Sequence, residues 1–161
     1  MNPLDIFQIA LTLYGFLPVY LANATPILTK GKIPLDMGHN FIDGKRLFGQ
    51  NKTLRGFAGG LTAGTLVGIL QGWPLRGVLL SLGALLGDLG GAFLKRRLGM
   101  KPGASLPVVD QLDFVGGAFL LVSLINPPTI TEALLITALT PIIHLSTNIA
   151  AYLLKLKKEP W

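Results

Sequence analysis

The sequence predicts an all-α fold: a polytopic membrane protein whose five transmembrane helices form one bundle. Half of its 161 residues are apolar and 14% are charged, against roughly a quarter charged in an ordinary soluble domain. The mean hydropathy is +0.57. The chain has no cysteine, which excludes a disulfide scaffold, a thiolate metal site and a cysteine nucleophile.

The predicted spans are windows that approach the roughly 20 apolar residues needed to cross a bilayer. The first window is too long for a signal peptide and is expected to stay in the mature chain. No internal repeat or long linker divides the sequence, so residues 1–161 are expected to form a single domain. The five windows cover residues 6–28, 57–73, 75–94, 112–125 and 130–154.

The basic residues predict the orientation, because positive loops stay in the cytoplasm. Of the 14 lysines and arginines, 13 fall on one side of the predicted membrane and only Arg76 on the other. The N-terminus is therefore expected outside, and the C-terminus and the active site at the cytoplasmic face of the cell membrane. The net charge of +6 favours lipid head groups or phosphates, not nucleic acid, as partners. The 13 residues are Lys30, Lys32, Lys45, Arg46, Lys52, Arg55, Lys95, Arg96, Arg97, Lys101, Lys155, Lys157 and Lys158.

Glycines predict how the second span packs, since small residues four apart allow helix backbones to approach closely. Glycines in the third and fourth spans indicate similar contacts, or room for a substrate. The second-span series is Gly56, Gly60, Gly64, Gly68 and Gly72.

Asp88 is the most informative residue for function, because it lies inside the third span, about 10 Å from its basic end at 1.5 Å per residue. A carboxylate at that depth needs a partner, a metal or a wet cavity. Lys95, seven residues later, shares its helix face. A structural ion pair with a neighbouring helix is the alternative interpretation.

Asp110 and Asp113 begin the fourth span on one helix face. Helix capping explains Asp110 well and Asp113 poorly. If Asp88 faces this pair, three oxygen donors meet at one end of the bundle. Such a group suits Mg²⁺ bound to substrate phosphates.

The loop between the first two spans threads Asp36 and Asp43 among basic residues and glycines. Its spacing does not fit a phosphate-binding P-loop, and no strand precedes it. Anionic lipid beside the loop would explain its positive charges but not its acids.

The fifth span carries a polar stripe that is expected to face the bundle interior. Its histidine could be a base or a ligand, although hydrogen-bonded packing is the favoured interpretation. The roles of His144 and Asn148 stay open. The stripe comprises Thr137, Thr140, His144 and Asn148.

These residues resemble the CDP-archaeol synthases and, more distantly, the CDP-diacylglycerol synthases, along nearly the whole chain. The distant relatives carry Ser-x-x-Lys-Arg and, after a gap, Asp-Arg-x-Asp. Here residues 92–96 read Ala-Phe-Leu-Lys-Arg and residues 110–113 read Asp-Gln-Leu-Asp, after Gly87-Asp88. Ala92 and Gln111 depart from that pattern. Residues 43–56 resemble the family's nucleotide-side loop.

The resemblance implies a CTP-dependent cytidylyltransferase that requires Mg²⁺. The phosphate of an isoprenoid ether lipid, 2,3-di-O-geranylgeranylglyceryl phosphate, would attack the α-phosphorus of CTP and release pyrophosphate. Asp88, Asp110 and Asp113 are expected to bind the metal, and Lys95 to act with them in catalysis. The expected substrate-binding residues are Asp43, Lys52, Thr53, Arg55, Arg96 and Arg97, with Lys95 among the phosphate ligands.

Three other functions are alternatives. A purely structural membrane subunit would leave Asp88, Asp113 and the loop from Asp36 to Arg55 unexplained. An acyl-phosphate glycerol-phosphate acyltransferase would share the basic, glycine-rich character but would not need three carboxylates. A transporter subunit would use Asp88 as an ion or proton site, yet it would be expected to show internal repeats. The sequence leaves open the oligomeric state, the number of metal ions, selectivity for CTP over dCTP, and the lipid chain length.

Overall fold

A computed structural model describes residues 3–101, 103–157 and 159, most of which are helical. Lys158, one of the basic residues used to predict the orientation, lies outside the described residues. The elements in chain order are α1 (Pro3–Gly15), α2 (Leu17–Ala24), η1 (Thr25–Ile27), α3 (Leu54–Leu70), α4 (Pro74–Arg97), α5 (Val109–Val122) and α6 (Ile130–Leu153).

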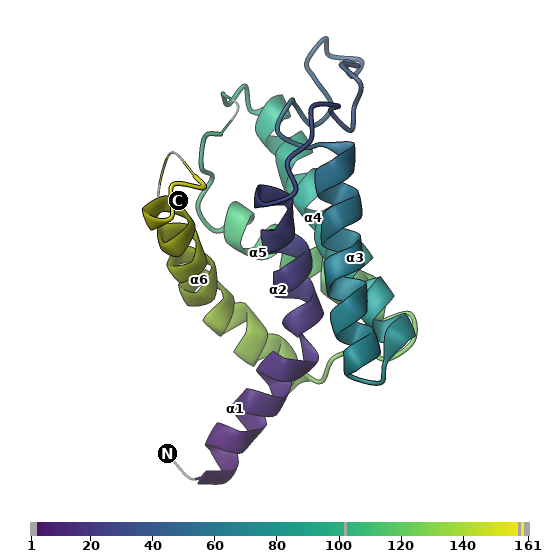
Figure 1. The fold of residues 1–161 in the computed structure, drawn as a ribbon, viewed down its shortest axis with the longest axis vertical. Helices are drawn as coiled ribbons and strands as arrows, with labels where there is room; N and C mark the ends of the chain where they lie inside the picture. Colours follow the sequence, from purple (N-terminus) through teal and green to yellow (C-terminus); the bar gives the residue numbers. More distant parts are fainter. Residues whose placement is uncertain (1–2, 102, 158, 160–161) are drawn as a thin grey trace.

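The helices form a bundle in which α2, α3 and α4 run side by side and α5 packs against α4 (Figure 1). α6 rests against α5 and α1, and α1 projects beyond the other helices. The loop 28–53, the last turn of α4 and the end of α6 lie toward the same end of the molecule, which we call the charged end. The core of the bundle is built around Phe16, Leu80, Ala84, Phe114 and Ile136.

The first predicted span is broken into two helices, α1 and α2, which meet at 47°. Pro18 at the start of α2 removes a backbone donor and prevents a continuous helix. Arg76, near the opposite end of α4 from the charged end, donates to the Gly15 carbonyl at 3.1 Å. Its guanidinium also lies 5.1 Å from the Phe16 ring centroid. The first window therefore holds two helices instead of one, because the proline creates a bend, which Arg76 then stabilises.

Helix ends follow local capping rules. Thr53 caps α3 by accepting a hydrogen bond from the Gly56 backbone at 3.1 Å. Thr129 and Glu132 form a reciprocal capping box at the start of α6. Pro74 begins α4, where its missing backbone N–H has no partner to lose. Three basic residues occupy the last turn of α4, where they interact favourably with the helix dipole.

Glycine packing of α3 is confirmed for four of the five expected positions, since Gly56, Gly60, Gly64 and Gly68 are buried. A Cβ at Gly68 would meet the backbone of Gly77 on α4. The fifth position was interpreted wrongly: Gly72 lies beyond α3, at a φ of +77° and with open space around it. Its role is to end the helix in a left-handed turn.

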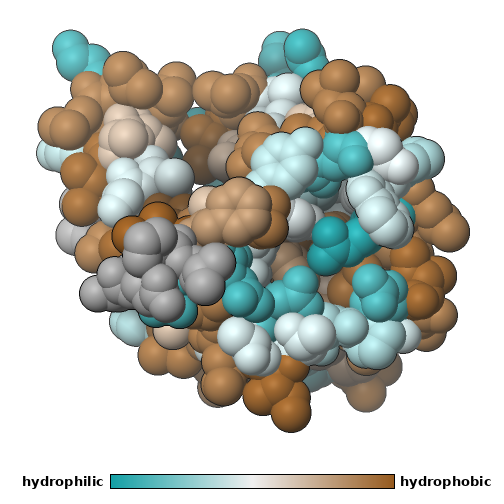
Figure 2. Space-filling view, turned by 90° about the horizontal axis from the view of Figure 1, so that it is seen from below, coloured by the Kyte–Doolittle hydropathy of each residue, from teal (hydrophilic) through white to brown (hydrophobic). Residues whose placement is uncertain are grey.

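By length and apolar composition, α4 and α6 can each cross a membrane, and the bent pair α1–α2 can form a third span. α3 and α5 are shorter, at 17 and 14 residues. The five-span count therefore stays a prediction, although each expected window contains a helix. Viewed from the end opposite the loop, hydrophobic residues predominate along the sides of the molecule (Figure 2). Exposed apolar side chains such as Leu70, Leu120 and Leu134 are consistent with contact to lipid.

Candidate active site

Two lysine–carboxylate ion pairs connect three segments near the charged end. Lys52, just before α3, donates to both oxygens of Asp88 on α4, at 2.6 and 2.5 Å. Lys95 on α4 lies 2.6 Å from Asp110 on α5. The sequence placed Lys95 on the face of Asp88, but in the structure it pairs with the next helix. The four side chains remain 18–30% exposed, so an anion from solution can reach them.

Asp113 lies against the glycine surface of α4. Its Oδ2 atom occupies the space that a side chain at Gly91 would need, and its backbone oxygen does the same at Gly87. Its Oδ1 accepts the Phe114 backbone N–H at 2.6 Å. The charge of Asp113 interacts with that of Asp88. The two glycines therefore allow a third carboxylate to approach the ion-pair region.

Asp110 contacts both the segment before α5 and a lysine of α4. Its Oδ2 accepts the Leu106 backbone N–H at 2.9 Å, which fixes the segment that leads into α5. Its other oxygen faces Lys95. The capping interpretation was wrong, because Val108 is the N-cap of α5 and no side chain among the described residues caps this helix. The Asp110 carboxylate instead joins α5 to α4.

Asp36 organises the loop 28–53 from a buried position, with 4% of its surface exposed. The Arg46 guanidinium pairs with it, and the backbone N–H groups of Phe48 and Gly49 donate at 3.1 and 2.8 Å. Burial by itself would raise the pKa of the Asp36 carboxyl. The hydrogen bonds outweigh burial and hold that pKa well below its ordinary value.

Arg97 and Asp43 attach the same loop to the end of α4. The Asp43 carboxylate lies 2.9 Å from Arg97 Nε. The Arg97 guanidinium also lies over the rings of Phe41 and Phe93, 5.1 and 4.4 Å from their centroids. Both residues were expected to bind substrate, and here they join loop to helix. Arg96 Nη2 donates to the Lys101 carbonyl at 3.2 Å beside this junction.

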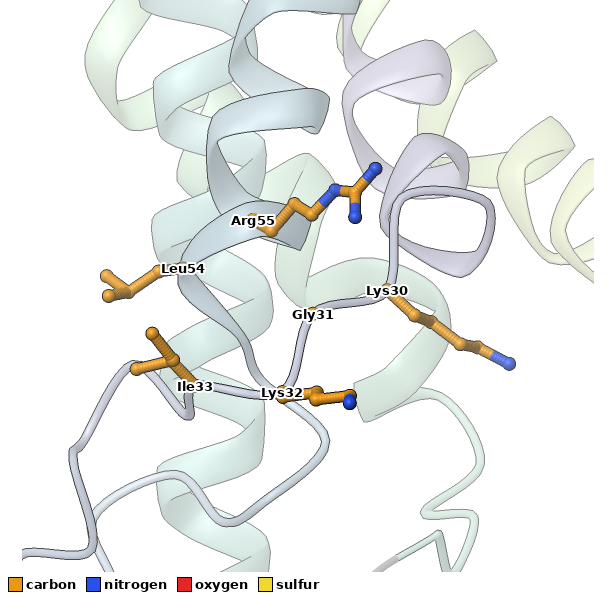
Figure 3. A pocket seen from close by; sticks show the side chains of 6 residues that line it. All are labelled: Lys30, Gly31, Lys32, Ile33, Leu54 and Arg55. Atoms are coloured by element: carbon orange, nitrogen blue, oxygen red, sulfur yellow. The ribbon is translucent and has the colours of Figure 1, made fainter.

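Thr53 and Arg55 were also expected at the substrate site. The Thr53 hydroxyl caps α3 and accepts the Gly31 backbone N–H at 3.2 Å, which fixes Lys52 next to it. Arg55 instead lines a separate basic pocket of about 390 Å³ with Lys30 and Lys32. The close-up shows these basic side chains extending to one side, and the apolar side chains of the pocket to the other (Figure 3).

The three expected metal ligands do not form a closed cage. Among the described residues, no group of three histidine, aspartate or glutamate side chains is arranged to hold a metal ion. Asp88 and Asp110 each face a lysine. The donor chemistry still suits Mg²⁺, which commonly binds one or two carboxylates and takes its other ligands from phosphates and water.

A mainly apolar groove of about 260 Å³ lies between α2 and α6, with Phe114 of α5 also lining it. Tyr20 links the two helices by a 2.9 Å hydrogen bond to Thr140. His144 and the buried Asn148 give the groove polar groups, and they hydrogen-bond to each other at 3.3 Å. The polar stripe thus faces inward at Thr140 and Asn148, as expected, whereas Thr137 is exposed.

Comparison with known proteins identifies the relatives of this arrangement. The sequence model of a family described as CarS-like, CDP-archaeol synthase, matches residues 5–76 and 74–161. The CDP-archaeol synthase of Thermofilum pendens is 46% identical over 96% of this chain and 82% of its own length. That of Pyrobaculum arsenaticum is 48% identical over 89% of this chain and 93% of its own length. The chain belongs to the CDP-archaeol synthase family.

A solved structure supports the same family membership. It is described as an intramembrane enzyme for archaeal membrane lipids biosynthesis. The two chains are 37% identical, with a TM-score of 0.78, and the match covers 85% of this chain and 92% of the other. The resemblance first identified through residues 87–113 is therefore confirmed.

Two residues that shape this site carry no signature of the CDP-archaeol synthase family, and their contacts were not predicted from the sequence. Asp36 was singled out only as an acid in a basic loop, and its burial was not foreseen. Lys157 was counted only as a positive charge, yet its ammonium donates to Asn148 at 3.1 Å. The polar stripe of α6 was the available signal, since a buried asparagine needs hydrogen-bond partners.

Proposed function

We propose that this chain transfers CMP from CTP to the phosphate of an archaeal ether lipid, 2,3-di-O-geranylgeranylglyceryl phosphate, forming CDP-archaeol and pyrophosphate for membrane phospholipid synthesis. Family membership supports the reaction. The observation that carries the residue roles is the pair of ion pairs, Lys52–Asp88 and Lys95–Asp110, whose carboxylates interact with His144 in the lining of the apolar groove.

The lysines are proposed to exchange a carboxylate for a phosphate when substrate binds. In the absence of an anion, each ammonium is neutralised by its aspartate. Phosphate oxygens form equally strong charge-assisted hydrogen bonds, so Lys52 and Lys95 can turn toward them. Arg96 lies beside this region and is proposed to add to phosphate binding. Thr53 then positions Lys52, and Asp43 with Arg97 positions the loop.

Asp88 and Asp113 are the carboxylates proposed to hold Mg²⁺ together with substrate phosphates, because Asp113 packs against Gly87 and Gly91, close to Asp88 on α4. A bound magnesium ion would neutralise phosphate oxygens as charge develops during transfer. Release of Asp88 by Lys52 would free its oxygens for this role. That Asp110 is a third ligand stays a prediction.

Substrate alignment supplies most of the remaining chemistry. The attacking oxygen belongs to a phosphate that is already ionised at neutral pH, so no strong base is required. A new bond forms between this oxygen and the α-phosphorus of CTP, and the bond to pyrophosphate breaks. The groove between α2 and α6 is proposed to hold the isoprenoid chains, which leaves the lipid phosphate at the charged end.

The chain is further proposed to cross the cell membrane five times, with the N-terminus outside and the active site facing the cytoplasm. The positive residues of the charged end support this orientation. CTP would then reach the site from the aqueous side, and the lipid would enter from the bilayer.

The deciding experiment measures pyrophosphate release by the purified protein in detergent with Mg²⁺, CTP and the lipid phosphate, with ATP, GTP and UTP as controls. Release should require both CTP and the lipid. Asp88→Asn should lower turnover about 100-fold or more, since it removes charge at the reacting phosphates. The exposed Lys101 gives a matched control, and Lys101→Ala should behave as the wild type. No release by folded wild-type protein would overturn the proposal.

Lys52→Ala separates nucleotide binding from chemistry. Loss of one charge-assisted contact should raise the KM for CTP roughly tenfold. An unchanged CTP titration would remove Lys52 from the nucleotide site. Normal turnover of Asp113→Asn would likewise remove that carboxylate from the metal site.

A further inference from the structure

The chain reverses direction immediately after α6. Lys155 adopts a φ of +58°, and the N–H groups of Lys155 and Leu156 each donate at 2.9 Å to carbonyls of the last turn. Gly72 forms the same kind of turn after α3. Glycine usually occupies this left-handed position, so a lysine there indicates that the returning segment is held by contacts of its own.

These contacts bring residues 154–157, which we call the return segment, to the groove. Leu154 and Leu156 line it beside Leu28. The Lys30 ammonium donates to the Leu156 carbonyl at 3.0 Å, which ties the segment to the chain that follows η1. The return segment therefore joins both walls of the groove.

Lys157 ends this segment in a partly buried position, where its ammonium donates to Asn148 Oδ1 at 3.1 Å. Its charge also interacts with those of Asp110, Lys95 and Lys52, which belong to the two ion pairs. Burial lowers the pKa of the Lys157 ammonium. This partly buried cation therefore contacts one groove residue, Asn148, and its charge interacts with members of both ion pairs.

We propose that Lys157 binds the phosphate of the lipid substrate and that Asn148 positions its ammonium. This proposal rests on the proposed function. Isoprenoid chains in the groove would leave their phosphate beside the return segment, and an ammonium neutralises such a group as a point charge. Lys157 thereby distinguishes a phosphorylated lipid from an uncharged one, while Lys52 serves the nucleotide.

The experiment compares Lys157→Gln and Lys157→Arg with Lys155→Gly. The last variant removes a positive charge from the same segment and keeps the left-handed turn. Pyrophosphate release is measured against the mole fraction of lipid phosphate at saturating CTP, and against CTP at saturating lipid. Lys157→Gln should raise the lipid KM on the order of tenfold. The KM for CTP and kcat should change less than about twofold.

Lys157→Arg should recover most of the lipid affinity, and Lys155→Gly should match the wild type. Unaltered CTP kinetics also show that the variants are folded. An unchanged lipid KM in Lys157→Gln would overturn the proposal, as would an equal rise in the CTP KM or an equal effect of Lys155→Gly. An inactive wild type would instead refute the proposed function, so the two failures are distinguishable.

A double-mutant cycle tests the role of Asn148. Asn148→Ala alone should raise the lipid KM, by less than Lys157→Gln does. In the Lys157→Gln background it should add almost nothing, because the ammonium it positions is absent. Additive effects would show that Asn148 acts only through packing and would overturn its positioning role.

Discussion

The two sides of this bundle are packed very differently. Half of the most apolar window of α4 is buried, compared with 17% of that of α6. On the α4 side, glycines bring backbones into contact: Gly83 and Gly87 meet Gly117 and Asp113 of α5. On the α6 side, a groove separates the helix from α2.

In the proposed function, the two sides have distinct tasks. Charged side chains that act on phosphates need fixed positions, and closely packed helices supply them. A groove for long, flexible hydrocarbon chains needs volume more than precision. The charged residues Asp88, Lys95 and Asp113 accordingly lie on α4 and α5, whereas α6 contributes mostly apolar wall.

The strongest test of this comparison is a methyl group placed between α4 and α5. A Cβ at Gly87 would overlap the Asp113 backbone oxygen, so Gly87→Ala must push the helices apart. Overpacking of this kind lowers the free energy of unfolding by about 1–3 kcal/mol. The apparent melting temperature should fall by roughly 5 °C, and turnover should fall about 100-fold, because a displacement of 1 Å can cost that much.

Gly90 provides the matched control on the same helix, three residues along the chain. Apart from the local helix backbone, no atom of the described residues lies within 4 Å of a Cβ built there. Gly90→Ala should therefore retain activity and keep or slightly raise the melting temperature, since alanine favours a helix over glycine by roughly 1 kcal/mol. Equal behaviour of the two variants would contradict the idea that close α4–α5 packing positions the site.

A smaller effect is expected from the loop that this packed side supports. Asp36→Asn removes the charge that Arg46 and two backbone donors bind. This change should lower the free energy of unfolding by about 1–3 kcal/mol. Trypsin should cleave the loop 28–53 roughly tenfold faster. Asp43→Asn breaks a more exposed pair with Arg97, and its effect should be smaller.

Low pH should weaken the same Asp36 interactions in the wild type. Because the folded pKa of Asp36 lies below its ordinary value near 3.8, its stabilisation is complete above about pH 4 and is lost as the pH falls further. The gap in melting temperature between wild type and Asp36→Asn should therefore be smaller at about pH 3 than at about pH 6, with the loss occurring below about pH 4. A constant gap would show that the carboxylate charge does not stabilise the loop.

Local rules predicted much of the packed side. Apolar windows located every helix, the spacing of Gly56 to Gly68 gave the buried face of α3, and Asp88 was identified by its depth. Pro18 is the sequence signal for the break at Phe16, but apolar length alone predicts a single span.

Pairing and long-range contacts could not be predicted in the same way. Helix periodicity placed Lys95 with Asp88, but the choice of Asp110 depends on how α5 crosses α4 in three dimensions. The burial of Asp36 depends on a loop with few regular hydrogen bonds. The return of Lys157 to Asn148 requires a left-handed lysine, a conformation that sequence patterns assign to glycine.

The smallest predicted effect tests the loosely packed side. Ala151 lines the groove, so Ala151→Leu should narrow it. The lipid KM should rise a few-fold, which corresponds to a loss of about 1 kcal/mol in binding free energy. The melting temperature should not change, because α6 has few close neighbours to displace. Ala138, exposed on the same helix and absent from the groove lining, is the control, and Ala138→Leu should leave the lipid KM unchanged. If Ala151→Leu instead lowered the melting temperature as much as Gly87→Ala does, α6 would be as tightly packed as α4. That result would contradict the division between a rigid charged side and an adaptable groove wall.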